Sequence, residues 1–308
     1  MEATIAICTR DRVELLERCL RSLATQVGEP GQFEVLVVDN GSTDGTAELL
    51  RSWQDGGSDR RVVREPRTGL ARARTTALHA SDREVILFTD DDALTPPGWA
   101  RAHTAAYADE AVGAAGGPIG LIWPGERPSW VTDEMAEWYG ALELGDEPCP
   151  FPTVHGPYGV NMSVRRQAAL DVGGYDPRLG RRGSKLLSGE EPDLTRRLMD
   201  AGHVIVYVPS AGLVHQVAPE RVRPRWLLRR GWAQGVTNAR LEVLATRPTR
   251  RRRIGRAREE LAGIGEHWRR RRSGDETQSE ATARALAAVG AGLEFLRLAE
   301  LDAQPGGQ

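Results

Sequence analysis

Residues 84–93, EVILFTDDDA, contain three consecutive carboxylates directly behind an apolar stretch that is typical of a buried strand. Adjacent carboxylates repel one another unless a cation lies among them. A divalent cation such as Mg²⁺ or Mn²⁺ prefers oxygen ligands and commonly also takes phosphate oxygens of a ligand. An isolated acidic triplet is more often a solvated turn before a helix, but its position at the end of a strand favours a metal site here.

Strand and helix signals alternate through the first third of the chain. Apolar runs typical of strands cover residues 4–8, 33–38, 61–63 and 84–88, and helical spacing covers 12–23, 43–53 and 70–80. This alternation predicts an α/β fold with a mostly parallel central sheet and helices on both faces. Ligands of such sheets bind beyond the carboxyl ends of the strands, so Thr9, Asp39 and Asp90 are expected at one edge.

The later parts of the chain differ from this pattern. Glycine, proline and tryptophan dominate residues 96–157, which indicates long loops. Regular signals return after residue 161, and beyond about residue 218 the chain is arginine-rich and helical. We therefore expect an α/β domain over residues 1–218 and a helical C-terminal extension over residues 219–308, with a disordered tail from residue 302.

Composition excludes several classes of protein. The 308 residues carry a formal net charge of −2, which argues against a nucleic-acid binder. Three cysteines are too few for a disulfide framework and indicate a reducing compartment. The first residues lack the pattern of a secretory signal, and no apolar run approaches the ~18 residues of a membrane span. These features predict a cytoplasmic protein.

A second acidic motif, Ser188-Gly189-Glu190-Glu191-Pro192-Asp193, lies near the start of an expected helix. Pro192 suits a first helical turn, and the helix dipole favours acids there, so the motif has a purely structural explanation. The functional alternative is that one glutamate faces a cleft as a general base. A carboxylate beside other carboxylates binds a proton more readily, which suits that role.

Seven segments follow one another in a characteristic order. They are TIAICTRDRVELLERCLRSL, EVLVVDNGSTDGT, GLARARTTAL, VILFTDDDALTPPGW, GVNMSVRRQAALDVGGYDPRLG, SGEEPDLTRRLMDAG and VYVPSAGLVHQ. Together they resemble an inverting family 2 glycosyltransferase with the GT-A (nucleotide-diphospho-sugar transferase) fold, over roughly residues 3–216. The resemblance implies that residues 1–218 form the catalytic domain.

The resemblance also implies roles for residues that match the family's nucleotide-binding motifs. Thr9 and Asp39 would hold the base and ribose of a nucleotide-sugar. Arg74 matches an arginine near the nucleotide, and Arg12 is a second candidate. Asn161 lies in the segment that lines the cleft for the donor sugar and acceptor.

The implied metal ligands come from the acidic run and from one histidine. Asp90 and Asp92 match the Asp-x-Asp (DxD) motif that binds Mn²⁺ or Mg²⁺ on the diphosphate. Asp91 lies between them and would contact the ribose or the metal, so the register of the pair is open by one residue. His215 matches a histidine that completes the metal shell in some relatives.

The family's catalytic base is usually the aspartate of a Glu-Asp pair, and here that position is Glu191. Glu190 remains the alternative. The implied reaction moves a single sugar from a nucleotide-sugar, most commonly a UDP-sugar in the family, to an acceptor hydroxyl or amine. The acceptor would be a glycan, a lipid-linked sugar or a small metabolite, and the transfer would invert the anomeric carbon.

Other functions fit parts of the sequence. The Glu-Glu pair leaves open a catalytically silent sugar-nucleotide-binding or scaffold protein. A sugar-phosphate nucleotidyltransferase would need a glycine-rich loop where this chain has Cys8-Thr9-Arg10-Asp11-Arg12. A processive polysaccharide synthase normally adds membrane spans and a Gln-x-x-Arg-Trp segment, but Val222 stands where that glutamine belongs.

The arginines of the extension suggest a further contact. They are concentrated in residues 250–253 and 269–272, and Trp226 and Trp232 also lie in the extension. Basic helices with aromatic residues suit peripheral contact with an anionic membrane or a diphosphate-bearing acceptor. The structural alternative is a solvated helical face packed on the catalytic domain.

Overall fold

The computed structural model describes residues 1–26, 32–152, 156–183, 185–273 and 277–301, so the predicted disordered tail lies outside the described residues. The chain divides into two compact units. The first comprises Met1–Ile122, Tyr139–Arg178 and Glu190–Val217, and the second comprises Trp123–Trp138, Leu179–Gly189 and Ala218–Gln308. Two short segments from the first 218 residues thus group with the C-terminal helices, and the domain boundary at residue 218 stays a prediction.

The first unit is built on an eight-stranded sheet with the order β3-β2-β1-β4-β9-β6-β10-β8. Its strands are β1 (Ala3–Thr9), β2 (Phe33–Asp39), β3 (Arg60–Arg64), β4 (Val85–Asp90), β6 (Val112–Gly116), β8 (Cys149–Pro150), β9 (Asn161–Arg165) and β10 (Val204–Tyr207). The first four strands pair in parallel, whereas β9 runs antiparallel between β4 and β6. The predicted α/β fold with a mostly parallel sheet is confirmed.

Helices flank this sheet, and their apolar faces follow the sequence spacing. They are α1 (Val13–Leu23), α2 (Thr46–Gln54), α3 (Leu70–Ala80), α4 (Trp99–Ala105), α6 (Arg166–Asp171) and α7 (Glu190–Asp200). In α1, the buried residues Leu16, Cys19, Leu20 and Leu23 lie three or four positions apart, so they share one face. The central strands carry near-continuous apolar runs because helices cover both faces of the sheet.

The strand register brings the predicted polar residues to one edge. Thr9 at the end of β1 pairs with Asp39 at the end of β2. On the other side of β1, Cys8 pairs with Asp90 at the end of β4. Because these strands are parallel, their carboxyl ends meet, as the sequence predicts.

The expectation of long loops over residues 96–157 is wrong for much of that segment. It contains α4, β6, β7 (Ile119–Ile122), α5 (Asp133–Ala136) and two 3₁₀ helices, Ala106–Ala108 and Glu137–Tyr139. Strand β7 joins β5 (Ala93–Leu94) and β11 (Leu213–Gln216) in a second, three-stranded sheet. Such short elements are stabilised by tertiary contacts and leave little periodicity in the sequence.

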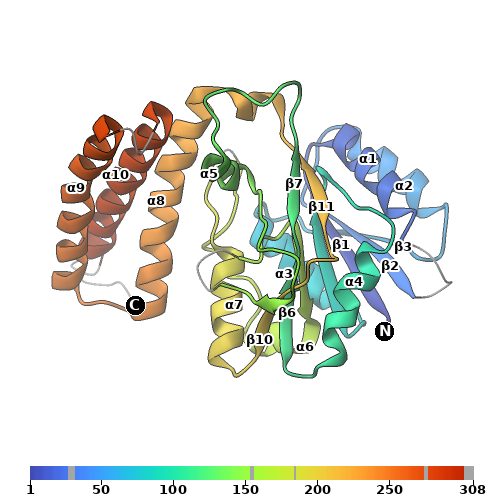
Figure 1. Cartoon of the computed structure of the whole chain (residues 1–308). Coiled ribbons are helices and arrows are strands. Elements are labelled where there is room, and N and C mark those ends of the chain that lie inside the picture. The colour runs from blue at the N-terminus through green and yellow to red at the C-terminus, as the bar shows by residue number, and fades with distance from the viewer. Residues whose placement is uncertain (27–31, 153–155, 184, 274–276, 302–308) are drawn as a thin grey trace. The chain divides into compact units, whose positions relative to one another are not determined.

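The second unit contains three long helices, α8 (Pro224–Thr246), α9 (Arg250–Ser273) and α10 (Gln278–Leu301), after a 3₁₀ turn at Pro219–Val222 (Figure 1). Glycines allow α8 and α10 to approach closely. A Cβ atom on Gly231 or Gly235 would overlap the backbone carbonyl oxygen of Ala283 or Ala287. Among the described residues, none of the helices reaches the combination of length and apolarity that a membrane crossing requires.

We expect Gly235→Ala to destabilise the second unit by about 1–3 kcal/mol, because the added methyl group meets a backbone oxygen of α10 and forces the helices apart. Gly255→Ala is the matched control, since a Cβ there meets no atom within 4 Å. That change should stabilise α9 by about 0.5–1 kcal/mol through helix propensity. Urea unfolding, followed by the circular dichroism signal of the helices, measures the change in unfolding free energy for both variants. Equal changes in the two variants would contradict the packing argument.

Candidate active site

Arg74 is a buried cation that three carboxylates surround. It lies on α3, and its side chain is 2% exposed. Its Nη1 donates hydrogen bonds to Glu190 Oε1 at 3.0 Å and to Glu191 Oε1 at 2.7 Å, and its Nη2 donates to Asp90 Oδ1 at 3.3 Å. The structure therefore joins the acid at the end of β4 to the two glutamates at the start of α7.

Glu191 has a second donor in the backbone of Gly159. The Gly159 N–H donates to Glu191 Oε1 at 3.1 Å. A Cβ atom on Gly159 would overlap both the Arg74 guanidinium and Glu191 Oε1, so only glycine allows this approach. The side chain of Glu191 is 14% exposed, compared with 2% for Glu190, so Glu191 is the more accessible of the pair.

The two glutamates differ in their protonation. Burial and the neighbouring Glu191 charge raise the pKa of Glu190 to about 8. Burial also opposes the charge on Glu191, but the Arg74 guanidinium helps to outweigh it and the pKa of Glu191 lies below its usual value. Glu190 Oε2 is buried and has no hydrogen-bond partner within the described part of the chain, which agrees with a neutral acid. The surroundings therefore favour the negative charge on Glu191, beside Arg74 and the Gly159 N–H, over a charge on the more deeply buried Glu190.

Asp91 is held inside the protein. Thr9 Oγ1 donates to Asp91 Oδ2 at 2.8 Å, and Arg12 Nη1 donates to Asp91 Oδ1 at 2.9 Å. The same Arg12 nitrogen donates to Asp92 Oδ2 at 2.8 Å. Burial raises the pKa of Asp91 to about 6 although Arg12 lowers it. Thr9 and Arg12, both predicted to contact the nucleotide, thus contact the acidic run.

The predicted metal ligands are only partly brought together. Asp92 Oδ1 lies 3.2 Å from His215 Nε2, whereas Asp90 points its carboxylate at Arg74. Across the described ranges, no three or more histidine, cysteine or acidic side chains converge in a geometry that could hold a metal. Two protein ligands still suit Mg²⁺ or Mn²⁺, because these ions commonly take their remaining ligands from water and substrate phosphates.

The orientation of His215 fits a cation beside Asp92. Its Nδ1 lies 3.0 Å from the carbonyl oxygen of Tyr139, so this nitrogen carries a proton. Nε2 then faces the Asp92 carboxylate, so these two atoms could both serve as ligands of one divalent cation. A histidine fixed through its second nitrogen is typical of metal ligands. The sequence could not predict the hydrogen bond from His215 to Tyr139, because a backbone carbonyl is present at every residue and gives no side-chain signal.

Asn161 has a different environment from the one predicted. Its Oδ1 accepts hydrogen bonds from Trp99 Nε1 at 2.8 Å and from His103 at 2.9 Å. Its Nδ2 donates to the carbonyl oxygens of Pro118 and Ala211 at 3.0 and 2.8 Å. These four bonds use the whole capacity of the amide. Asn161 therefore supports the loops around the site and has no free donor or acceptor left for a ligand.

Asp39 lies at the predicted edge. It follows the apolar residues of β2 and is 7% exposed, and its Oδ1 accepts a hydrogen bond from the Ser42 N–H at 2.9 Å. Asp193, on α7, is engaged by Arg196 and Arg197 and so has a structural role.

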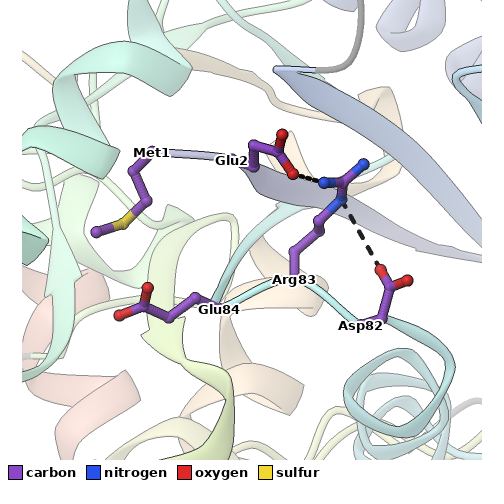
Figure 2. A pocket seen from close by; sticks show the side chains of 5 residues that line it. All are labelled: Met1, Glu2, Asp82, Arg83 and Glu84. Atoms are coloured by element: carbon purple, nitrogen blue, oxygen red, sulfur yellow. Dashed lines mark ion pairs between the residues drawn. The ribbon is translucent and has the colours of Figure 1, made fainter.

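A surface pocket of about 460 Å³ lies elsewhere, lined by Met1, Glu2, Asp82, Arg83 and Glu84 (Figure 2). These residues precede β1 and β4, so they lie at the amino ends of strands whose carboxyl ends carry Thr9 and Asp90. Arg83 forms ion pairs with Glu2 and Asp82 there. The pocket is therefore separate from the acidic edge.

Several curated proteins are similar in sequence to this chain. The chain is similar to a glucosyl-dolichyl phosphate glucuronosyltransferase of Haloferax volcanii, with 27% identity over 252 residues that cover 79% of this chain and 78% of the relative. It is also similar to the glycosyltransferase AglE of the same organism, with 24% identity over 70% of this chain and 67% of that protein. A pre-mycofactocin glycosyltransferase of Mycobacterium tuberculosis shares 28% identity over 76% of this chain and 46% of its own length.

Two solved structures share the fold. The mannosyltransferase PcManGT from Pyrobaculum calidifontis, in complex with GDP-Man and Mn²⁺, superposes with a TM-score of 0.56 at 21% identity and covers 98% of this chain and 74% of its own. GalNAc-T7 with UDP, GalNAc and Mn²⁺ superposes with a TM-score of 0.55 at 18% identity, over 77% of this chain and 48% of its own. Both likenesses concern the fold alone.

A family comparison covers the first four of the seven sequence segments and part of the fifth. Residues 4–173, more than half of the chain, match the family described as "Glycosyl transferase family 2". That range includes β1, the acidic run after β4 and the Arg74 helix, which together build the edge described above. The chain therefore belongs to glycosyl transferase family 2, has the GT-A fold, and is a glycosyltransferase.

Proposed function

We propose that this protein transfers a single sugar from a nucleotide-sugar to an acceptor hydroxyl or amine with inversion at the anomeric carbon, and that Glu191 is the base. The observation that carries this proposal is the contact of one guanidinium, Arg74, with Asp90, Glu190 and Glu191. It fixes a potential base beside the edge at which ligands of parallel sheets bind.

Glu191 has the properties that a base in this reaction needs. It is ionised at neutral pH, it is partly accessible, and Arg74 and Gly159 hold its Oε1 in place. Its carboxylate takes the proton of the acceptor as the acceptor oxygen or nitrogen attacks the anomeric carbon. The nucleoside diphosphate leaves from the opposite face in the same displacement, which inverts the configuration.

The leaving diphosphate needs positive charge. Asp92 and His215 would hold a divalent cation, Mn²⁺ or Mg²⁺, which when bound neutralises charge that develops on the diphosphate. Arg12 contacts Asp91 and Asp92 and so provides a second positive group at the same edge. Thr9 and Asp39 lie at the ends of adjacent strands and suit contacts to the base and ribose.

The donor and acceptor follow from relatives by analogy. The names of the two fold neighbours include GDP-Man in one and UDP in the other, and we propose a UDP-sugar as donor with GDP-sugars as the alternative. One relative is named for a glucosyl-dolichyl phosphate acceptor, which supports a lipid-linked sugar over a free glycan or a small metabolite. A catalytically silent binding protein would show donor binding without any turnover.

We expect Glu191→Gln to lower sugar transfer and donor hydrolysis at least about 100-fold with little change in donor binding, because the amide cannot accept the proton. Glu190→Gln is the matched control. It replaces a side chain that is already neutral below about pH 8, so turnover should stay within about tenfold. Release of UDP from UDP-glucose and GDP from GDP-mannose measures both, and the reverse order of effects would make Glu190 the base.

The buried Glu190 should make stability fall as pH rises. Its pKa is about 8 in the folded protein, above the usual value of 4.5, so between these pH values the folded state holds a proton that the unfolded state has lost. Unfolding then becomes easier with rising pH across this window. The free energy of unfolding, measured with urea at pH 5 and pH 8, should fall more for the wild type than for Glu190→Gln. Parallel falls in the two proteins would refute the raised pKa of Glu190.

Asp92→Asn should abolish the Mn²⁺-dependent part of nucleotide binding. A ligand that binds only the folded state raises the Tm, so we expect UDP or GDP with Mn²⁺ to stabilise the wild type but not the variant. Asp55→Asn, an exposed change with the same loss of charge, is the control and should keep the shift. If Asp92→Asn kept the full shift while Asp90→Asn lost it, the metal register would move to Asp90.

A further inference from the structure

Helix α9 carries a straight row of residues on its exposed side. The row consists of Arg251, Gly255, Arg258, Ala262, Gly265, Arg269 and Arg272, and we call it the arginine row. Its members follow one another at alternating spacings of four and three, so they lie on one face of the helix. With a rise of about 1.5 Å per residue, the row is about 30 Å long.

The opposite side of α9 packs within its own unit. Ala257 is buried, and a Cβ on Gly292 of α10 would meet Leu261 at 2.8 Å. Arg253 donates to the carbonyl oxygen of Leu298, and Arg256 binds Glu242 of α8. These contacts engage the buried face of α9 and leave the arginine row pointing away from α8 and α10.

Three of the four arginines in this row have no acidic partner among the described residues. Arg251, Arg258 and Arg272 are exposed and form no ion pair or side-chain hydrogen bond with any residue that the structure describes. Arg269 pairs with Glu266, which flanks the row. The row itself contains four arginines and no acid, although the whole chain has a formal charge of −2.

Two glycines in the row have no role in packing. A Cβ on Gly255 or Gly265 would meet no atom within 4 Å. Glycine inside a helix lowers the stability of the helix by about 1 kcal/mol relative to alanine, and no internal contact offsets this loss at these two positions. Small residues between the arginines allow a flat external surface to come close to the helix backbone. Each guanidinium can then reach that surface without a bulky side chain beside it.

One border of the row is apolar. Ile254, Leu261 and Trp268 follow one another seven positions apart between the row and the packed face of α9, and Trp268 is the exposed member of the three, at 37%. Tryptophan beside arginine is typical of helices that lie at a membrane surface, where the indole enters the headgroup region. A second copy of α9 would be repelled by the same charges, and nucleic acid would gain nothing from the apolar border.

We propose that the arginine row of α9 docks on a bilayer that contains anionic phospholipids. The guanidinium groups bind the lipid phosphates, and Trp268 enters the interface beside them. This docking involves the α9 surface alone and does not depend on the proposed reaction.

The test uses the full chain with phosphatidylcholine vesicles that contain 30% phosphatidylglycerol and with pure phosphatidylcholine vesicles. We expect the wild type to co-sediment with the anionic vesicles at low salt and to be released at high salt. The variant R251Q/R258Q/R269Q/R272Q should reduce the partition coefficient at least about tenfold. The charge-matched control R18Q/R21Q/R51Q/R101Q, which changes exposed arginines of the first unit, should reduce it less than about threefold.

A single substitution provides a test that does not depend on whether the quadruple variant folds. Ala262→Glu places a carboxylate in the centre of the row and should weaken vesicle binding about fivefold, whereas Ala245→Glu on α8 should not. Equal losses in each variant and its control would overturn the proposal, as would no binding of the wild type to anionic vesicles. Tighter binding to duplex RNA than to vesicles at equal phosphate concentration would assign the row to nucleic acid and overturn it too.

Discussion

The Arg74 guanidinium is buried, so its charge has to be balanced by carboxylates within the protein. Asp90 and Glu191 provide this charge from two distant segments, and Glu190 adds a further hydrogen-bond acceptor for Arg74. Removing one member of such a group leaves the others with an unbalanced charge, which is more costly than removing all of them together. The end of β4, the helix α3 and the start of α7 are therefore energetically linked.

The same contact gives the two adjacent glutamates different chemistry. Glu191 lies closer to Arg74 and receives a backbone N–H, whereas Glu190 is more deeply buried. Their pKa values consequently move in opposite directions, as is common where two acids serve different roles. The absence of a side chain at Gly159 is part of this arrangement, because a Cβ would occupy the space of both partners.

The acidic run after β4 is divided in a comparable way. Asp90 turns toward Arg74, Asp91 toward Thr9 and Arg12, and Asp92 toward Arg12 and His215. Three adjacent acids thus have different neighbours, because successive residues at the end of a strand point in different directions. This separation favours Asp92 over Asp90 as the partner of His215.

Much of the fold could be read from periodicity. The strands at β1, β2 and β4 and the helix α3 appear where apolar spacing predicts them, since burial between two helical layers requires apolar strands. Residues 96–157 could not be read in this way, because their short elements depend on contacts with distant segments. Trp99 illustrates this: the sequence suggests a loop residue, yet its indole is buried and donates to Asn161.

Apolar patterning and local motifs are properties of neighbouring residues, so the fold class, the family and the strand edge at which the acids gather can be read directly from the chain. Which carboxylate meets which cation depends instead on how distant segments come together in the folded protein. The pairing of Arg74 with Glu191, the filled hydrogen bonds of Asn161 and the Tyr139 carbonyl behind His215 all join segments far apart in the chain. The energies of these contacts depend on distance and burial, and neither quantity follows from the order of the residues alone.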